Sequence, residues 1–418
     1  MEIYSTMDIK EKLRFIEHIQ QPSKRDKKKT EPELSTEQVI DGELLESEFG
    51  KVLIKIKEYD ASFKHGFVSL GRVDEISPHL LHLAGKDEDL LQMDLRRSLF
   101  FDTETTGLAG GSGTYIFLAG FGYFENTKFI IKQFFLRDFP DELATLHAIH
   151  ELMRKFDGIV SFNGKSFDLP LLQTRFTYHR IKSNFDELPH LDLLHAARRV
   201  WKHRLKDCSL GNLEYEIINV RRDNDIPSYL IPHLYFEYLR TKDLQPLKKV
   251  FYHNEIDILS LVTLTIMLNQ IHEQPTEKLE NHIDLRTLAK HYENTKQWQR
   301  NIPIYKSLIQ SELNQEAKTD LQFRLGCCYK SLDQWENAVA TWEQALTEGK
   351  FRIETYEELA KFYEHRVRDF ARAEQLVQQA LTNLEFLEQV NHQSDYADHR
   401  KNLIHRLQRI QRKKTINY

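Results

Sequence analysis

The chain has 418 residues and a formal net charge of −5, with 40% hydrophobic and 29% charged residues. This composition excludes a disordered chain and a protein that coats nucleic acid by bulk positive charge, and the length predicts two or three domains. No apolar stretch approaches the roughly 20 residues of a membrane helix, and the opening residues lack the apolar segment of a signal peptide, so we expect a cytoplasmic protein without a membrane partner.

Residues 1–95 form the first predicted region, to which the sequence assigns no chemistry. An amphipathic pattern over residues 8–20 predicts a short helix, and the polar, lysine-rich residues 21–33 predict a basic linker. A solvated charge run is a simpler interpretation of this linker than a tether for nucleic acid. Residues 34–95 mix short apolar segments with glycine and proline.

Residues 96–272 form the second predicted region, an α/β domain. Three apolar runs, SLFFDTE, TYIFLAGFGYF and KFIIKQFFL, are separated by turn residues and predict an antiparallel meander. Helical and strand patterns follow in alternation, which predicts a mixed sheet flanked by helices. The later predicted elements are a helix over 141–155, a strand over 158–162, a helix from residue 168, and helices over 191–204, 231–240 and 243–271.

Residues 280–410 form the third predicted region, which is all helical and repetitive. A small residue three positions before a tyrosine recurs at Ala289, Gly326 and Ala360, with separations of 37 and 34 residues. Helix pairs that stack closely need small residues where they cross, so this pattern predicts tetratricopeptide-like repeats. An unrelated helical bundle is the alternative. Because such repeats form a groove, we expect a protein partner at this region.

Two acidic residues end the first strand of the α/β region. Asp102 and Glu104 are two positions apart, and the alternation of side chains along a strand places them on one face. Burying two acids together is unfavourable unless a cation neutralises them. The competing interpretation is an exposed strand end that enters a turn.

Two further acids lie at other points of the same region. Asp168 follows a predicted strand and a turn through Gly164, where an aspartate is also common as a helix N-cap, and Asn163 is also an ordinary turn residue. His253 and Asp257 are four positions apart in a predicted helix, so their side chains share one face. An ordinary surface pair has the same spacing.

Three segments together carry a resemblance to a known family. They are FFDTETTGL, FNGKSFDLPLL and YHNEIDILSL, which resemble the three motifs of the ribonuclease H-like DEDD exonuclease superfamily, in the same order. Within that superfamily, the segments GGSGTYIFLAG and SLGNLE and the helical repeats resemble a bacterial YprB-like group. The resemblance covers roughly residues 98–271, with the repeats after it.

The resemblance implies a nuclease that works with two Mg²⁺ or Mn²⁺ ions and degrades nucleic acid from 3′ to 5′. It implies that Asp102 bridges both ions, that Glu104 and Asp257 complete the site of the ion that activates water, and that Asp168 supports the second ion. It also implies substrate-binding roles for three residues beside the acids. These are Asn163, Thr105 and Lys165.

The third motif departs from the superfamily pattern at one point. The last aspartate is expected to follow a catalytic histidine at five positions back, or a tyrosine at four positions back. Here Tyr252 stands at five and His253 at four, so the residue types are exchanged. By position His253 is expected to act as the general base or to orient water, which its ordinary pKa near 6.5 allows. Tyr252 is the second candidate.

A local excess of basic residues follows the second motif. Its members are Arg175, Arg180, Lys182, Arg198, Arg199, Lys202, Arg204 and Lys206. We expect them to track a phosphate backbone, although a solvated helix face explains them equally well. Asp192, in the same segment, is expected to support the acids without being a fifth ligand.

Two other functions fit the same residues. An inactive ribonuclease H-like scaffold would recruit a protein through its repeats, and the exchanged histidine and tyrosine keep that alternative. A metal-dependent phosphohydrolase that acts on small nucleotides is the other. No residue pattern identifies a reader of the 2′-hydroxyl, so a nucleic acid substrate is expected without a choice between DNA and RNA.

Overall fold

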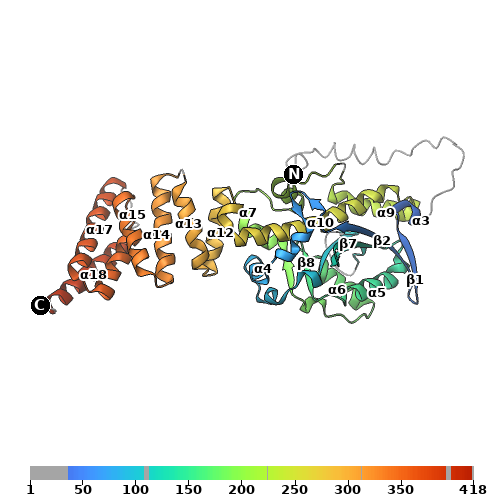
Figure 1. Cartoon of the computed structure of the whole chain (residues 1–418), viewed down its shortest axis with the longest axis horizontal. Coiled ribbons are helices and arrows are strands. Elements are labelled where there is room, and N and C mark those ends of the chain that lie inside the picture. The colour runs from blue at the N-terminus through green and yellow to red at the C-terminus, as the bar shows by residue number, and fades with distance from the viewer. Residues whose placement is uncertain (1–35, 108–112, 224, 312, 392–396, 417–418) are drawn as a thin grey trace. The chain divides into compact units, whose positions relative to one another are not determined.

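A computed structural model describes residues 36–107, 113–223, 225–311, 313–391 and 397–416 (Figure 1). Contacts between residues divide the chain into two compact units, Met1–Glu273 and Gln274–Tyr418. The helix expected over residues 8–20 and the basic linker expected over 21–33 lie outside the described residues.

The first unit is built on a mixed sheet of seven strands in the order β1-β2-β7-β6-β5-β8-β9. β5, β6 and β7 form the antiparallel meander expected from the sequence, whereas β8 and β9 add to β5 in parallel. The α/β fold with a mixed sheet is therefore confirmed. The strands are β1 Glu43–Ser47, β2 Gly50–Asp60, β5 Ser98–Thr105, β6 Ile116–Glu125, β7 Lys128–Phe135, β8 Gly158–Ser161 and β9 His190–Asp192, with a separate hairpin of β3 Lys64–His65 and β4 Val68–Ser69.

Part of the sheet comes from the region to which the sequence assigned no chemistry. β2 pairs antiparallel with β7 over eight residue pairs, from Leu53 opposite Phe135 to Asp60 opposite Lys128, and β1 continues the sheet beyond it. The domain boundary expected between residues 95 and 96 therefore falls inside one compact unit.

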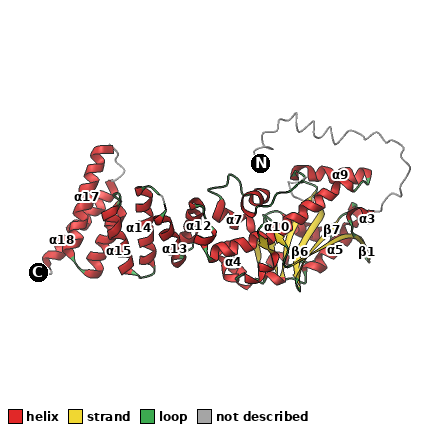
Figure 2. Cartoon of the chain, turned by 45° about the horizontal axis from the view of Figure 1, so that its top comes forward, coloured by secondary structure: helices red, strands yellow, loops and turns green. Residues whose placement is uncertain are grey.

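Helices cover both faces of this sheet (Figure 2). α5 Glu142–Met153 and α6 Asp168–Tyr178 pack on one face, where a buried apolar cluster joins them to Phe101 and Phe121. α9 Ile231–Thr241 and α10 Lys248–Glu273 pack on the other face, against Phe117 and Phe135. The other α-helices among the described residues of this unit are α3 Thr36–Ile40, α4 Pro78–Gly85, α7 Leu193–Trp201 and α8 Leu210–Leu213.

Two glycines of β6 let α10 lie close to the sheet. A Cβ atom on Gly120 would come within 2.1 Å of the Asn254 side-chain oxygen, and one on Gly122 within 2.5 Å of Ile258. Atoms cannot approach so closely, so any larger residue would push α10 away from the sheet. This close approach brings the middle of α10 to the end of β5.

The described part of the second unit is helical. Its helices are α11 Pro275–Lys278, α12 His282–Asn294, α13 Trp298–Gln310, α14 Gln315–Ser331, α15 Trp335–Glu348, α16 Ile353–Phe362, α17 Phe370–Asn391 and α18 Ala397–Ile416. From α12 onwards each helix packs against the next one in the sequence. The small position at Gly326 has a steric cause, because a Cβ there would lie 2.1 Å from the buried Trp342 indole of α15.

Among the described residues, no helix combines the length and the apolar character that crossing a membrane requires.

Candidate active site

The end of β5 supplies the first two acids. Asp102 and Glu104 lie on the face of β5 that meets α10, while Thr103 between them points toward α6. The Oδ2 atom of Asp102 accepts a hydrogen bond of 2.8 Å from the Asn254 side-chain amide of α10. The strand-end motif is therefore packed inside the fold and is not an exposed turn.

Asn254 is a site residue that sequence reasoning missed. It is fully buried, and its side-chain oxygen accepts a hydrogen bond of 2.8 Å from the Gln133 amide of β7. Because its oxygen is bound to Gln133, its amide nitrogen points toward Asp102 and donates to that carboxylate. Asn254 thus fixes the orientation of the Asp102 carboxylate, and its position inside the third motif was the available signal.

α10 also brings a histidine and an aspartate to the acids of β5. The His253 Nε2 atom lies 4.0 Å from Oε1 of Glu104 and 3.5 Å from Oδ2 of Asp257. Ligand atoms of Glu104, His253 and Asp257 all lie within 4.8 Å of one another, which is a spacing that one metal ion can span. The shared helical face expected for His253 and Asp257 is confirmed.

The fourth acid comes from the other side of the sheet. Asp168 is the first residue of α6 and is 6% exposed, and Phe167 before it occupies the N-cap position. Its carboxylate accepts a hydrogen bond from the Thr103 hydroxyl. The alternative role of Asp168 as an N-cap is therefore not the one it has here.

Asp192 has the supporting role expected of it. Its carboxylate oxygens accept hydrogen bonds from the backbone amides of Asn163 at 2.9 Å, Lys165 at 3.2 Å and Leu194 at 3.1 Å. It therefore fixes the loop that leads to Asp168 and caps α7 at once.

Burial and mutual repulsion raise the pKa values of the clustered acids. Burial, followed by the charges of Asp257, Glu104 and Asp168, raises the pKa of Asp102 well above its ordinary value. Burial also raises the pKa of Glu104 to about 8 and the pKa of Asp168 to about 6. Carboxylates gathered in this way at low exposure need a cation to be ionised together, and a divalent ion fits that need.

An arginine and two further acids surround the α10 side of the site, and none was expected from the sequence. Arg222 pairs with the buried Glu214 at 2.5 Å, with Asp225 at 3.1 Å and with Oδ1 of Asp257. Glu214 begins the π-helical turn η6 Glu214–Ile218. Arg222 and Asp225 lie between this turn and η7 Ser228–Leu230. Glu214 ends the SLGNLE segment, whereas Arg222 and Asp225 lie outside every recognised motif.

Asp225 holds the second ring nitrogen of His253. The Nδ1 atom lies 2.9 Å from both Asp225 oxygens. Burial alone would lower the pKa of His253, but Asp257, the hydrogen bond to Asp225 and Glu104 together raise it to about 9. The imidazole is therefore fixed on one edge by Asp225 and faces Glu104 and Asp257 with the other.

Two of the three residues expected to bind substrate have other side-chain partners, and the third makes a turn. The Thr105 hydroxyl donates to the Gly107 carbonyl at 2.9 Å, and the Lys165 ammonium pairs with Asp87 at 2.9 Å. Asn163 has a φ of 65°, so it makes the left-handed turn before α6. Their roles in substrate binding stay predictions.

His253 and Tyr252 differ in where they lie on α10. Tyr252 is 37% exposed, whereas His253 is 9% exposed and faces Glu104 and Asp257. Of the two candidates for the general base, only the histidine is seen against the acids in the described part of the chain.

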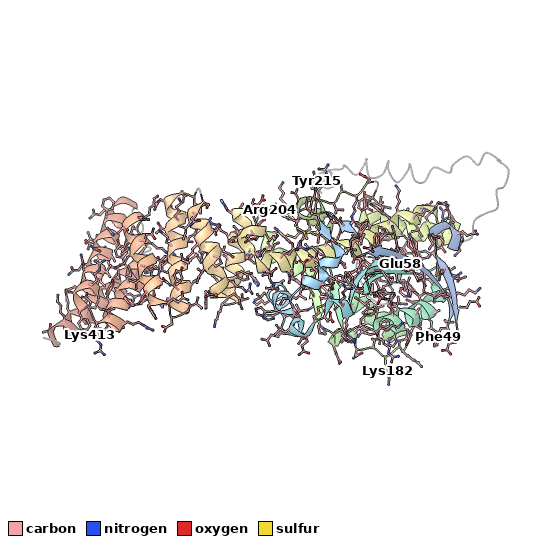
Figure 3. The ribbon with its side chains drawn as sticks, viewed as in Figure 1. Phe49, Glu58, Lys182, Arg204, Tyr215 and Lys413 are labelled. Carbon is pink, nitrogen blue, oxygen red and sulfur yellow. The ribbon has the colours of Figure 1, made fainter. Side chains whose placement is uncertain are left out.

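The basic residues after the second motif do not form one surface. Arg175 is 1% exposed and pairs with Glu142, which makes it a core residue. Arg199 donates to the Ala84 carbonyl at 2.8 Å. Figure 3 places Lys182 and Arg204 at opposite edges of the first unit. The phosphate contact expected of Arg175 is therefore wrong, and that of the other basic residues stays a prediction.

Two comparisons with known proteins bear on this geometry. A family model described as RNase_H superfamily matches residues 99–269. This range contains β6 and α6 and holds the five residues expected at the catalytic centre. A protein of Bacillus subtilis (strain 168), described as uncharacterized protein YprB, is 33% identical over 338 residues. That alignment covers 79% of this chain and 80% of the Bacillus protein.

Proposed function

The chain belongs to the YprB family within the RNase_H superfamily, and from this we propose that it is a divalent-metal-dependent nuclease, specifically a 3′ to 5′ exonuclease. One observation carries the proposal. Side chains from β5, α6 and α10, separated by up to 155 residues in sequence, converge into one buried acidic cluster. Such a cluster is unfavourable in a protein that only needs to fold, and a cation-dependent activity explains it.

Each acid of the cluster would have its own role in binding the ions. Asp102, on which the charges of Glu104, Asp168 and Asp257 all act, would contact both ions. Glu104 and Asp257 would hold the ion beside His253, and Asp168 the second ion. When bound, the Mg²⁺ or Mn²⁺ ions supply charge for the attacking and the leaving oxygen of a phosphodiester. Asn254 and Thr103 keep the carboxylates of Asp102 and Asp168 oriented.

The substrate that we propose is a nucleic acid chain, on the grounds of the family and of the acidic cluster. Hydrolysis of a phosphodiester by in-line attack fits a nucleic acid chain, DNA or RNA, with Asn163, Thr105 and Lys165 beside the cleaved bond. Lys165 would have to exchange Asp87 for a phosphate, and a half-exposed ion pair of this kind is weak enough to exchange.

The experiment for this proposal uses oligonucleotides of DNA and of RNA labelled at the 5′ or at the 3′ end. With Mn²⁺, a 3′ to 5′ exonuclease releases a labelled mononucleotide at once from the 3′-labelled strand. It shortens the 5′-labelled strand stepwise. Internal fragments at early times would indicate an endonuclease, and cleavage of small phosphodiesters alone would indicate the phosphohydrolase.

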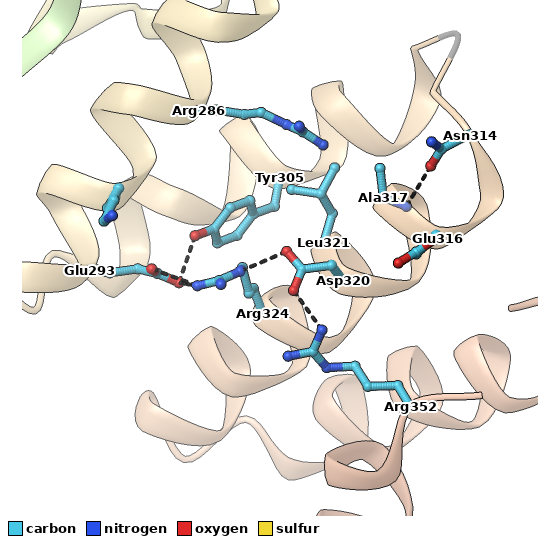
Figure 4. A pocket seen from close by; sticks show the side chains of 11 residues that line it. Arg286, Glu293, Tyr305, Asn314, Glu316, Ala317, Asp320, Leu321, Arg324 and Arg352 are labelled. Atoms are coloured by element: carbon cyan, nitrogen blue, oxygen red, sulfur yellow. Dashed lines mark hydrogen bonds and ion pairs between the residues drawn. The ribbon is translucent and has the colours of Figure 1, made fainter. Parts of the chain in front are cut away.

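A scaffold without catalysis is a second candidate because of Arg222. Its guanidinium contacts Asp257, so one charge of the cluster is neutralised by the protein itself. In that case the second unit, proposed to be tetratricopeptide-like, would bind a protein partner. It has a polar cavity of about 650 Å³ in which Glu293, Arg324, Asp320 and Arg352 alternate in charge, with Tyr305 beside Glu293 (Figure 4).

The two candidates differ in what a single substitution does. If the chain is an enzyme, Asp102→Ala abolishes Mn²⁺-dependent hydrolysis and leaves the binding of a partner unchanged. If it is a scaffold, the native protein hydrolyses no single-stranded, duplex or hybrid substrate.

A further inference from the structure

The position of the His253 imidazole matches that of a metal ligand. Two atoms that each lie about 2.1 Å from one ion are about 3.0 Å apart at right angles and about 4.2 Å apart when opposite. Nε2 of His253 lies 3.5 Å from Oδ2 of Asp257 and 4.0 Å from Oε1 of Glu104. Both separations fall inside that interval. Within the described residues, Nε2 has these two carboxylates as its polar neighbours.

The contacts at Nδ1 determine which nitrogen carries the hydrogen atom. Asp225 offers only acceptors, and both of its oxygens are 2.9 Å from Nδ1. Arg222 Nη1 lies 3.1 Å from Nδ1, but it lies equally close to Asp225, which can accept its hydrogen. The hydrogen of the neutral ring is therefore on Nδ1, and the lone pair of Nε2 points toward Glu104 and Asp257.

Two of the proposed carboxylate ligands are held in the same manner. Asp257 uses Oδ1 to accept from Arg222 and turns Oδ2 toward His253. Asp102 uses Oδ2 to accept from Asn254. Each of these ligands thus has one atom fixed by a neighbour, which leaves its other atom for an ion. A carboxylate on the far nitrogen of a ligating histidine is the usual arrangement at protein metal sites.

We propose that Nε2 of His253 binds the divalent ion directly, together with Glu104 and Asp257, and that Asp225 is the positioning residue that holds this ring. The proposal rests on the proposed nuclease function but replaces the general-base role that the sequence gave His253. Because an imidazole nitrogen binds transition metals better than it binds Mg²⁺, this ion should be Mn²⁺ in preference to Mg²⁺.

The direct test is pulsed electron paramagnetic resonance of Mn²⁺ bound to the whole protein. A nitrogen nucleus bonded to Mn²⁺ modulates the echo, and labelling histidine with ¹⁵N changes the modulation in a known way. We expect this nitrogen signal in the native protein and its loss in His253→Gln. His195→Gln is the matched control, because His195 is exposed on α7 and should retain the signal.

A second variant separates positioning from folding. Asp225→Asn should keep the nitrogen signal, because the ring remains. Its dissociation constant for Mn²⁺ should rise about 10- to 100-fold. Its Mg²⁺ affinity should fall less than its Mn²⁺ affinity. Unchanged Mn²⁺ affinity in Asp225→Asn would remove Asp225 from the proposal.

The failures of the two proposals have different signatures. Native protein that binds Mn²⁺ and digests oligonucleotides but gives no nitrogen signal would overturn His253 as a ligand and leave the nuclease intact. Native protein that binds Mn²⁺ nowhere in its first unit and digests nothing would overturn the nuclease, and the ligand proposal with it.

Discussion

The Arg222 guanidinium joins Asp257 of the acidic cluster to Glu214, a glutamate that is 1% exposed. Ser260 also donates to Glu214, at 2.5 Å, so this carboxylate is fully engaged inside the fold. Arg222 therefore stabilises the buried Glu214 and also contacts Asp257 of the site. The two effects can be separated by measurement.

Arg222→Gln should destabilise the first unit by about 3 to 5 kcal/mol, because the buried Glu214 charge is left without its partner. Urea unfolding measures the loss. The control is the double variant with Glu214→Gln, which removes both charges and should recover a large part of the stability. Equal losses in the single and double variants would show that the ion pair is not the cause.

The metal-free protein should lose stability as the pH rises from about 4.5 to about 9. Glu104 has a folded pKa of about 8 against an ordinary 4.5, and His253 one of about 9 against 6.5. The folded state therefore holds more protons than the unfolded state across this window, so deprotonation favours unfolding. Thermal unfolding in EDTA should show the decline, and saturating Mn²⁺ should flatten it. A melting temperature that rises through this window without metal would contradict the acidic cluster as described.

Asp102→Asn should stabilise the metal-free protein and remove its response to Mn²⁺. The substitution deletes one of several buried like charges, and such relief at a functional site commonly gains about 0.5 to 2 kcal/mol. Differential scanning fluorimetry with EDTA and with Mn²⁺ measures both effects. Asp157→Asn serves as the control, since that side chain is exposed and pairs with Arg97 away from the cluster. It should keep the native rise in melting temperature on Mn²⁺ addition.

Gly120→Ala should weaken both stability and metal binding. Its new Cβ would lie 2.1 Å from the Asn254 side-chain oxygen, so α10 must shift, at a cost of about 1 to 3 kcal/mol. The shift carries Asn254, His253 and Asp257 away from β5, and Mn²⁺ affinity falls with it. Gly211→Ala on α8 meets nothing within 4 Å and should change neither quantity. Isothermal titration with Mn²⁺ distinguishes the two variants.

Glu364→Gln should loosen the second unit without affecting nuclease activity. Glu364 is buried, and Arg406, Arg409 and Lys413 of α18 all pair with it at 2.7 to 2.9 Å. Removal of its charge leaves three cations of α18 without their shared acceptor. Hydrogen exchange should quicken in α18, while the exposed Glu336→Gln should leave it unchanged. Unchanged exchange in Glu364→Gln would mean that apolar packing alone holds α18.

Short-range patterns predicted the centre of the first unit well. β5, β6 and β7 appear as largely apolar runs because both of their faces are mostly buried. α5 begins and ends near its expected limits, and α6 begins at its expected residue. Asp102, Glu104, Asp168 and Asp257 converge because each sits at a defined point of such an element. Local periodicity is a strong signal wherever burial is complete.

Long-range pairing explains what the sequence did not reveal. β2 is half exposed along its length, so only its pairing with β7 identifies it as part of the sheet. Arg222 and Asp225 lie in a loop without periodicity and acquire their roles by meeting α10, 35 and 28 residues further along the chain. Lys165 meets Asp87, which is 78 residues away. None of these partners can be read from local spacing.

We propose that the acidic cluster hydrolyses nucleic acid with a divalent ion. The most direct measurement is the rate of digestion of an end-labelled oligonucleotide by native protein and by Asp257→Asn, with Mn²⁺ and with EDTA. We expect digestion by the native protein with Mn²⁺ alone, and a rate for folded Asp257→Asn lowered at least about 100-fold. Equal digestion by the two proteins, or digestion that persists in EDTA, would rule out metal-dependent hydrolysis at this cluster.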